Sequence, residues 1–126
     1  MTSHPFDQNL DQPIESTTFG DVSIVGFQTG SLLDESLVRA FERTALNAAV
    51  TVDRPKLIVD FEGVVHLTSA ALGALLTIRR EVEGRQGTLI LASLSPAIDE
   101  VFDIACLRPV FVFAPDRSAA IDLCQA

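Results

Sequence analysis

The fold is decided by residues 57–76, which read LIVDFEGVVHLTSAALGALL. The run from Lys56 to Phe61 is short and almost continuously apolar, as expected of a strand buried on both faces. We expect a loop over residues 62–68 and then a helix over about residues 69–82, with an inner face formed by Leu72, Leu75, Leu76 and Val82. A buried strand followed by a helix is the repeating unit of a parallel α/β sheet.

The same alternation extends toward the N-terminus. Residues 14–19 and 22–28 flank Gly20-Asp21 and predict a β-hairpin. A loop over residues 29–32 leads to a helix that Ser31 or Asp34 can cap and that ends before Arg54-Pro55. The apolar positions of this helix recur at helical spacing and are Leu33, Leu37, Phe41, Ala45 and Ala48.

Toward the C-terminus, residues 84–87 contain two glycines that stop the second helix, and residues 88–94 predict another buried strand. Ser95 and Pro96 predict the N-cap and first residue of a third helix. A strand over 110–114 and a helix from the Asp116 cap to Leu123 follow. The inner face of the third helix is expected to hold Ile98, Val101, Phe102 and Ala105.

These elements predict a single α/β domain over residues 14–126. Its sheet is expected to be mixed and mostly parallel, with about five strands, about four helices and an opening β-hairpin. Residues 1–13 are polar and are expected to form a flexible leader.

The charge balance restricts the partners. Nine Lys and Arg residues stand against 17 Asp and Glu residues, which gives a formal charge of −8. Such a surface repels nucleic-acid phosphates and anionic lipid, so we expect a partner that presents basic groups. The longest weakly polar run, residues 69–78, is too short to span a bilayer, and residues 1–13 lack the apolar centre of a signal peptide. A cytoplasmic protein without membrane insertion is predicted.

Two cysteines, Cys106 and Cys124, are too far apart to form a CxxC or zinc pattern. We expect them to be small, buried or half-buried thiols in a reducing compartment. No metal and no cofactor is predicted.

Thr68 and Ser69 place two hydroxyl groups where the second helix is expected to begin. A hydroxyl there can cap the helix, which is worth about 1 kcal/mol. It can also accept a phosphate, because free backbone amides and the helix dipole accommodate a dianion. Phosphorylation adds about −1.5 to −2 charges, which can disrupt a packed interface without unfolding the domain. The two roles are compatible.

The stretch resembles the core motif of the STAS family, which contains the bacterial anti-sigma-factor antagonists. In that family a buried strand and a short loop lead to Asp-Ser-Ser/Thr-Gly-Leu-Gly at a helix start, and a partner kinase phosphorylates the serine after the aspartate. With Leu72-Gly73 matched to the family Leu-Gly, Ser69 falls on the phosphorylated serine. Thr68 falls on the aspartate, which makes Thr68 the second candidate acceptor, while Ala70 replaces the second hydroxyl and Ala71 the glycine.

Further segments extend this resemblance over about residues 14–123. Residues 59–64 (VDFEGV) are similar to the family's strand end, and residues 87–91 (GTLIL) to its Gly-Gly-x-Leu-x-Leu strand. Residues 98–107 are similar to its pattern of apolar, Phe and Leu positions. Gly30 and Asp34 stand in the segment where the family has a partner-binding Gly-x-Leu-Asp, with one extra residue between them.

The resemblance implies an anti-sigma-factor antagonist, not an enzyme, that regulates transcription by switching partners. Its unphosphorylated form would bind a serine-kinase anti-sigma factor and release a sigma factor. Phosphorylation at Ser69 would break that complex, and a phosphatase would restore it. The partner contact would be lined by Thr68, Ala70, Leu72, Gly73, Gly30 and Asp34.

Two other functions remain open. One is a non-phosphorylated STAS binding or scaffold module, such as a lipid-transporter subunit, which Thr68 in place of the aspartate favours. The other is a small hydrolase using Ser69 and His66, although no Gly-x-Ser-x-Gly elbow and no orienting acid accompany them.

Other clusters have ordinary structural interpretations. Asp60 and Glu62 share one side of a strand end, where a magnesium or acid–base site is conceivable but a loop cap or a solvated acid is favoured. Residues 79–85 carry mixed charges and predict a solvated helix face with i,i+4 pairs. Phe111 and Phe113 are expected in the core, or in an interaction patch if their strand lies at an edge.

Overall fold

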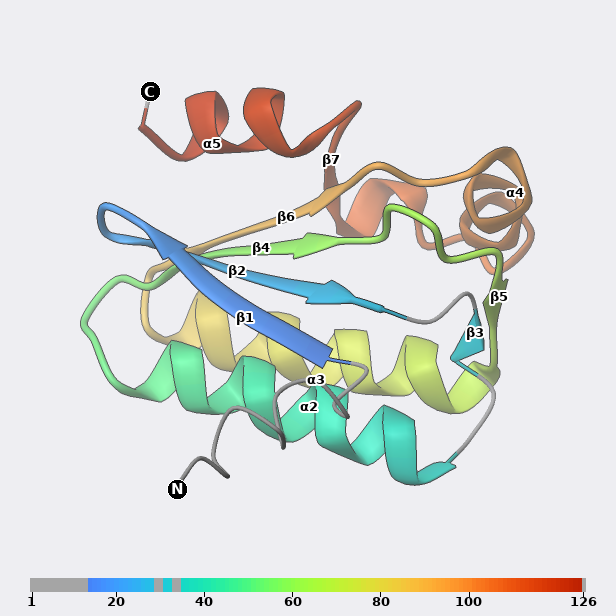
Figure 1. The fold of residues 1–126 in the computed structure, drawn as a ribbon, viewed down its shortest axis with the longest axis horizontal. Helices are drawn as coiled ribbons and strands as arrows, with labels where there is room; N and C mark the ends of the chain where they lie inside the picture. Colours follow the sequence, from blue (N-terminus) through green and yellow to red (C-terminus); the bar gives the residue numbers. More distant parts are fainter. Residues whose placement is uncertain (1–13, 29–30, 33–34, 126) are drawn as a thin grey trace, which may run out of the picture.

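The computed structural model describes residues 14–28, 31–32 and 35–125. A five-stranded mixed sheet has α2 and α3 on one face, α5 on the other and α4 at one end (Figure 1). This confirms the expected α/β fold with an opening hairpin; the proposed leader, residues 1–13, lies outside the described residues. The elements in chain order are β1 (Ile14–Phe19), β2 (Val22–Phe27), β3 (Ser31–Leu32), α2 (Glu35–Val50), β4 (Lys56–Asp60), β5 (His66–Leu67), α3 (Ser69–Gly84), β6 (Thr88–Ala92), α4 (Pro96–Ile104), η1 (Arg108–Val110), β7 (Val112–Ala114) and α5 (Arg117–Gln125).

The main sheet has the order β1-β2-β4-β6-β7. β1 and β2 are antiparallel, and β2, β4, β6 and β7 are parallel to one another. The hairpin turns at Gly20, whose φ of 64° suits glycine. Lys56 Nζ lies 3.1 Å from Asp21 Oδ2 at this turn, and its hydrogen bond and charge lower the pKa of Asp21. The ion pair therefore fastens the turn to the start of β4.

Side chains alternate along the strands into two cores. On the α2–α3 face, Phe27 lies against Phe41 and Phe61, with ring centroids 5.2 and 5.5 Å apart. On the other face, Ile24 and Ile58 belong to a smaller core closed by α5. Both faces of the central strands are therefore buried, which explains their almost continuous apolar sequence.

The helical periodicity predicts the inner faces correctly in outline. Of the predicted positions, Phe41, Ala45, Leu75 and Val82 are fully buried. Leu37, Ala48, Leu72 and Leu76 are half-buried and pack against the same core, while Leu33 and the proposed Asp34 cap lie outside the described residues. The helices also bury positions that the pattern missed, namely Val38, Ala49, Ala71, Ala74 and Ile78.

The predicted strand over residues 110–114 is partly wrong. Residues Arg108–Val110 form the 3-10 turn η1, and β7 begins only at Val112. Pro109 favours the turn because its φ is fixed and it has no N–H for a ladder. Phe111 is buried and Phe113 half-buried at the sheet edge, and the two rings lie 6.5 Å apart beside Phe102. They are core residues, as expected.

The ends of β6 and α3 also differ from prediction. β6 stops at Ala92 rather than residue 94, because Ser93 turns the chain with a φ of 64°. α3 ends at Gly84, and the left-handed residue that follows is Gln86 rather than a glycine. Gly87 N then donates to Val82 O at 2.9 Å and closes this end of the helix.

Ala105 and Cys106 were expected to be at least half-buried and are exposed. α4 ends at Ile104, and Cys106 adopts a left-handed φ of 60° that turns the chain away. Leu107 N donates to Phe102 O at 2.9 Å across this turn. Cys124 is buried, as predicted.

Candidate functional site

The candidate site is the N-terminus of α3, where the chain arrives from β4 through a tight loop. Gly63 has a φ of 84°, and Val64 N donates to Phe61 O at 2.9 Å. The chain then forms β5, which pairs in parallel with β3: Ser31 with His66 and Leu32 with Leu67. Both strands were predicted as loops, because a two-residue strand carries no readable periodicity. This small sheet fixes the backbone directly before Thr68.

Thr68 is the N-cap of α3. Its backbone is extended, with φ −97° and ψ 167°, and its Oγ1 accepts a hydrogen bond from Ala71 N at 3.2 Å. Leu72 N donates to Thr68 O at 3.2 Å, which starts the helical ladder. The half-buried Thr68 therefore performs the capping role that sequence alone could assign to either hydroxyl.

Ser69 is the first residue of α3 and is exposed. Because the cap hydrogen bond is made by Thr68, Ser69 Oγ stands outside the cap. Ala70 and Gly73 are also exposed, and a Cβ built on Gly73 would meet nothing within 4 Å. These three residues form a surface of small side chains that a partner can approach closely.

The remaining predicted contact residues have different positions. Leu72 is half-buried and packs against the core below this surface. Gly30 and Asp34 lie outside the described residues, although β3 between them pairs with β5 beside the site. His66 lies on β5 with its side chain exposed.

The electrostatics of the helix start favour an anion. No acidic residue occupies the first turn of α3, and the N-terminal amides carry the positive end of the helix dipole. Asp60, which ends β4, is withdrawn from this surface: only 2% of its side chain is exposed. A dianion on Ser69 would therefore meet the helix dipole without an acid in the same turn.

Asp60 is a structural residue. Its Oδ1 accepts from Glu62 N at 3.2 Å, which confirms the expected loop cap. Its Oδ2 accepts from Arg117 Nε at 2.8 Å, so the acid is buried and paired instead of solvated. Arg117 also lies 3.7 Å from Glu15 Oε1. Sequence reasoning missed this network, because Arg117 lies far from Asp60 along the chain.

No metal site is evident in the part of the chain that the structure describes. There, no three His, Cys, Asp or Glu side chains come together in a way that could hold an ion. None of the helices described is long and apolar enough to cross a bilayer.

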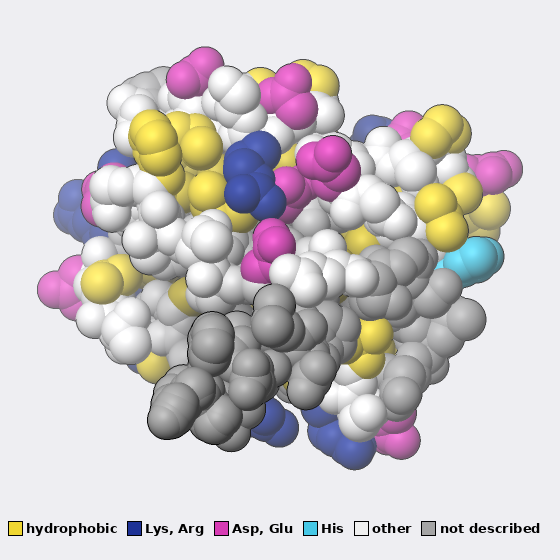
Figure 2. Space-filling view, in the orientation of Figure 1, with side chains coloured by type: hydrophobic (Ala, Val, Ile, Leu, Met, Phe, Trp, Pro, Cys, Tyr) yellow, Lys and Arg dark blue, Asp and Glu magenta, His cyan; other side chains and the backbone are white. Residues whose placement is uncertain are grey.

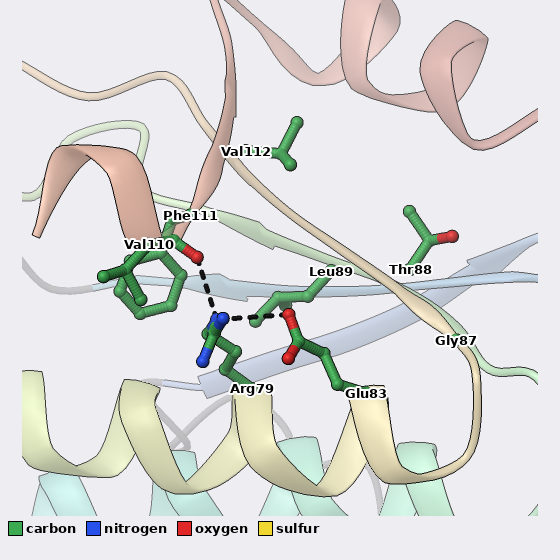
Figure 3. A pocket seen from close by; sticks show the side chains of 8 residues that line it. All are labelled: Arg79, Glu83, Gly87, Thr88, Leu89, Val110, Phe111 and Val112. Atoms are coloured by element: carbon green, nitrogen blue, oxygen red, sulfur yellow. Dashed lines mark hydrogen bonds and ion pairs between the residues drawn. The ribbon is translucent and has the colours of Figure 1, made fainter.

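A groove of about 260 Å³ lies at the sheet edge, between α3 and the ends of β6 and β7. Figure 3 shows Arg79 in this groove, with Nε donating to Val110 O at 2.8 Å and lying 3.2 Å from Glu83 Oε2. Arg85 pairs with Glu81 at 2.7 Å, so the predicted i,i+4 pairs of α3 are present. Arg79 thus serves to hold η1 against α3.

Comparison with known proteins gives consistent matches. The STAS domain model matches residues 14–120. A protein described as "Putative anti-sigma factor antagonist BtrV", from Bordetella bronchiseptica, is 31% identical over 75 residues, which are 60% of this chain and 65% of that protein. The match thus spans a little less than two thirds of this relative's length.

Two solved structures show the same fold. An anti-sigma-factor antagonist (STAS) domain protein from Planctomyces limnophilus superposes with a TM-score of 0.78 at 24% identity, covering 87% of this chain and 95% of that one. The Bacillus cell fate determinant SpoIIAA in its phosphorylated form gives 0.66 at 24% identity, covering 87% and 97%. The chain belongs to the STAS domain family, and proteins similar to it in sequence and in structure are described as anti-sigma-factor antagonists.

Proposed function

We propose that this chain is a cytoplasmic anti-sigma-factor antagonist that changes partners when Ser69 is phosphorylated. In the unphosphorylated state the start of α3 binds a serine-kinase anti-sigma factor, which then releases its sigma factor. The kinase uses ATP to transfer a phosphate to Ser69, the complex dissociates, and a phosphatase restores the first state. The chain itself performs no catalysis in this cycle.

The observation that carries the proposal is that Thr68 caps the helix while the neighbouring Ser69 is exposed. Thr68 caps the helix: the residue is half-buried, and its hydroxyl oxygen accepts a hydrogen bond from Ala71 N. Ser69 is exposed at the first position of the same helix. A kinase can reach Ser69 without breaking the cap, which makes Ser69 the preferred acceptor and Thr68 the second choice.

The surroundings of Ser69 suit a switch that leaves the fold intact. The amides of the first helical turn and the helix dipole stabilise a phosphate on this side chain. The neighbours Ala70 and Gly73 are small and exposed, so a partner packed on them would have no room for the phosphate. Burying an added charge of about −1.5 to −2 in that contact would be costly, so the partner would dissociate.

The charge of the chain supports a protein partner over a nucleic acid. With a formal charge of −8, the surface attracts basic groups and repels phosphate backbones. The phosphorylated SpoIIAA of Bacillus, which has the same fold, provides a precedent for a phosphorylated state in such a domain.

The test is phosphorylation in vitro. The chain is incubated with ATP and each purified serine-kinase anti-sigma factor of the source organism, and its mass is followed. We expect the gain of one phosphate, retained in Thr68→Ala and lost in Ser69→Ala. If none of the kinases modifies Ser69 or Thr68, the chain is instead a non-phosphorylated binding module.

The switch itself is tested by binding. Ser69→Asp should weaken the complex with the kinase, because it places a charge on the small-residue surface. Ser118→Asp is the matched control: Ser118 is also an exposed serine in the first turn of a helix, but it belongs to α5 on the other face of the sheet. Equal affinities of Ser69→Asp and wild type would contradict the proposal.

A further inference from the structure

Helix α4 carries a second apolar stripe that the domain does not bury. Ile98 and Phe102 face the core, with 1% and 0% exposure. Ala97, Val101 and Ile104 recur at i, i+4 and i+7 and therefore share another face. Ala97 is exposed, Val101 is half-buried, and Ile104 is 76% exposed, more than any other large apolar residue described.

This stripe lies beside the candidate site. Ser95 Oγ, at the start of α4, donates to Val64 O at 3.2 Å, and α4 packs against β5. Val65, between that bond and β5, is itself 45% exposed. Figure 2 shows hydrophobic side chains gathered over α4, next to the cyan histidine side chain. We name Val65, Ala97, Val101 and Ile104 the α4 patch.

One acidic residue, Glu100, lies beside the α4 patch and forms what we call its acidic frame. Glu100 is exposed and lies on the stripe face, three residues after Ala97 and four before Ile104. Arg108, the base closest to α4 along the chain, is already paired with Asp99 and with Asp103, the latter at 2.6 Å. The hydrogen bonds to Asp103 and Asp99 raise the pKa of Arg108, and its positive charge is already balanced by these two acids. An occupant of the α4 patch therefore meets an apolar centre and an uncompensated acid.

We propose that the α4 patch is a docking surface for the anti-sigma factor, which presents there an apolar side chain framed by Lys or Arg. This inference rests on the proposed function and extends its interface from the start of α3, across β5, to α4. Charge selects this occupant over a second copy of the chain, because two copies would bring their Glu100 residues and two charges of −8 together. The apolar centre supplies affinity and the acidic frame selects the partner.

The test measures the affinity of the purified serine-kinase anti-sigma factor by calorimetry, with ADP present so that no phosphate can be transferred. Ile104→Gln removes the most exposed apolar group and should weaken binding about tenfold or more. Leu123→Gln is the matched control, since Leu123 is 48% exposed on α5 and should change affinity by less than about twofold. Ala97→Gln probes the other end of the stripe if Ile104→Gln lowers the unfolding midpoint.

A second pair of variants tests the acidic frame. Glu100→Lys should weaken binding and reduce its dependence on salt, whereas Asp122→Lys, an exposed acid on α5, should do so much less. Full affinity in both Ile104→Gln and Glu100→Lys, with release by Ser69→Asp, overturns the α4 patch alone. No binding by the wild-type chain overturns this inference and the proposed function together. A wild-type dimer that Ile104→Gln dissociates assigns the patch to a second copy and also overturns the inference.

Discussion

Arg117 Nε, at the start of α5, lies 2.8 Å from Asp60 Oδ2, at the end of β4, and this bond joins the last helix to the centre of the sheet. The carboxylate is 2% exposed and the arginine side chain 39%. Replacing the arginine alone should lower the stability of the fold, because the buried carboxylate would be left without its partner.

Arg117→Met should therefore lower the free energy of unfolding by about 3 kcal/mol, the lower end of the range for buried pairs, since water reaches the arginine. Urea denaturation measures this loss. Arg39→Met is the control, because Arg39 and Glu35 are 61% and 81% exposed, and their pair should be worth less than about 1 kcal/mol. Equal losses in the two variants would show that burial of Asp60 does not strengthen its pair.

Thr68→Ala should destabilise the domain by about 1 kcal/mol, because it removes the acceptor for Ala71 N. Thr68→Asp should retain most of this stability, since aspartate also caps helices and suits the positive end of the dipole. Thr77→Ala is the contrast within α3: Thr77 Oγ1 donates only to Gly73 O, and alanine is the better helix former. Thermal unfolding should therefore rank Thr77→Ala at or above wild type and Thr68→Ala below it.

Two glycines should respond in opposite directions to the same substitution. Gly73→Ala should stabilise the chain by about 0.5–1 kcal/mol, because a Cβ there meets open space within a helix. Gly87→Ala should destabilise it by about 1–3 kcal/mol, because the Cβ would stand 2.3 Å from Pro55 O. Urea midpoints that move in the same direction would contradict the packing at one of these sites.

The two thiols should differ in accessibility. Burial raises the pKa of the Cys124 thiol above its ordinary value of 9.0, while Cys106 is exposed. Iodoacetamide should label Cys106 in the native chain and Cys124 only after unfolding, as mass spectrometry of the two peptides will show. Rapid native labelling of both would mean that α5 leaves the sheet readily.

The raised pKa of Cys124 also gives a pH dependence. Above pH 9.0 the unfolded chain loses this proton first, so the folded chain binds more protons and stability falls as the pH rises further. The fall should be smaller in Cys124→Ala, after allowance for its lower starting stability, and unchanged in Cys106→Ala. Urea titrations over this pH range measure it.

Hydrophobic periodicity, together with turn and helix-capping residues, was enough to predict most of the fold. The buried strands β4 and β6 are apolar on both faces, and Asp116 caps α5 as predicted, with Oδ1 accepting from Ala119 N at 2.8 Å. What escaped prediction depends on contacts between distant segments. The β3–β5 pair and the Arg117–Asp60 bond each join residues that no short pattern relates.

The candidate site could likewise be predicted only in part from the sequence. Sequence places two hydroxyls at a helix start, but only the backbone decides which of them is the cap. The extended conformation of Thr68 turns its side chain to Ala71 N and leaves Ser69 exposed. The periodicity of α4 placed Val101 and Ala105 on its inner face, but Val101 is half-buried and Ala105 and Ile104 are exposed, because only Ile98 and Phe102 reach the core.

The pairing of β3 with β5 has a mechanical consequence. The strands β3 and β5 come from distant parts of the chain and form one two-stranded sheet directly before Thr68 and Ser69. A force applied to one strand is shared by the other, so the backbone before Ser69 should move little when a partner contacts β3. Because backbone groups make this pairing, substitutions of the side chains on β3 should leave the backbone that leads to Ser69 in place.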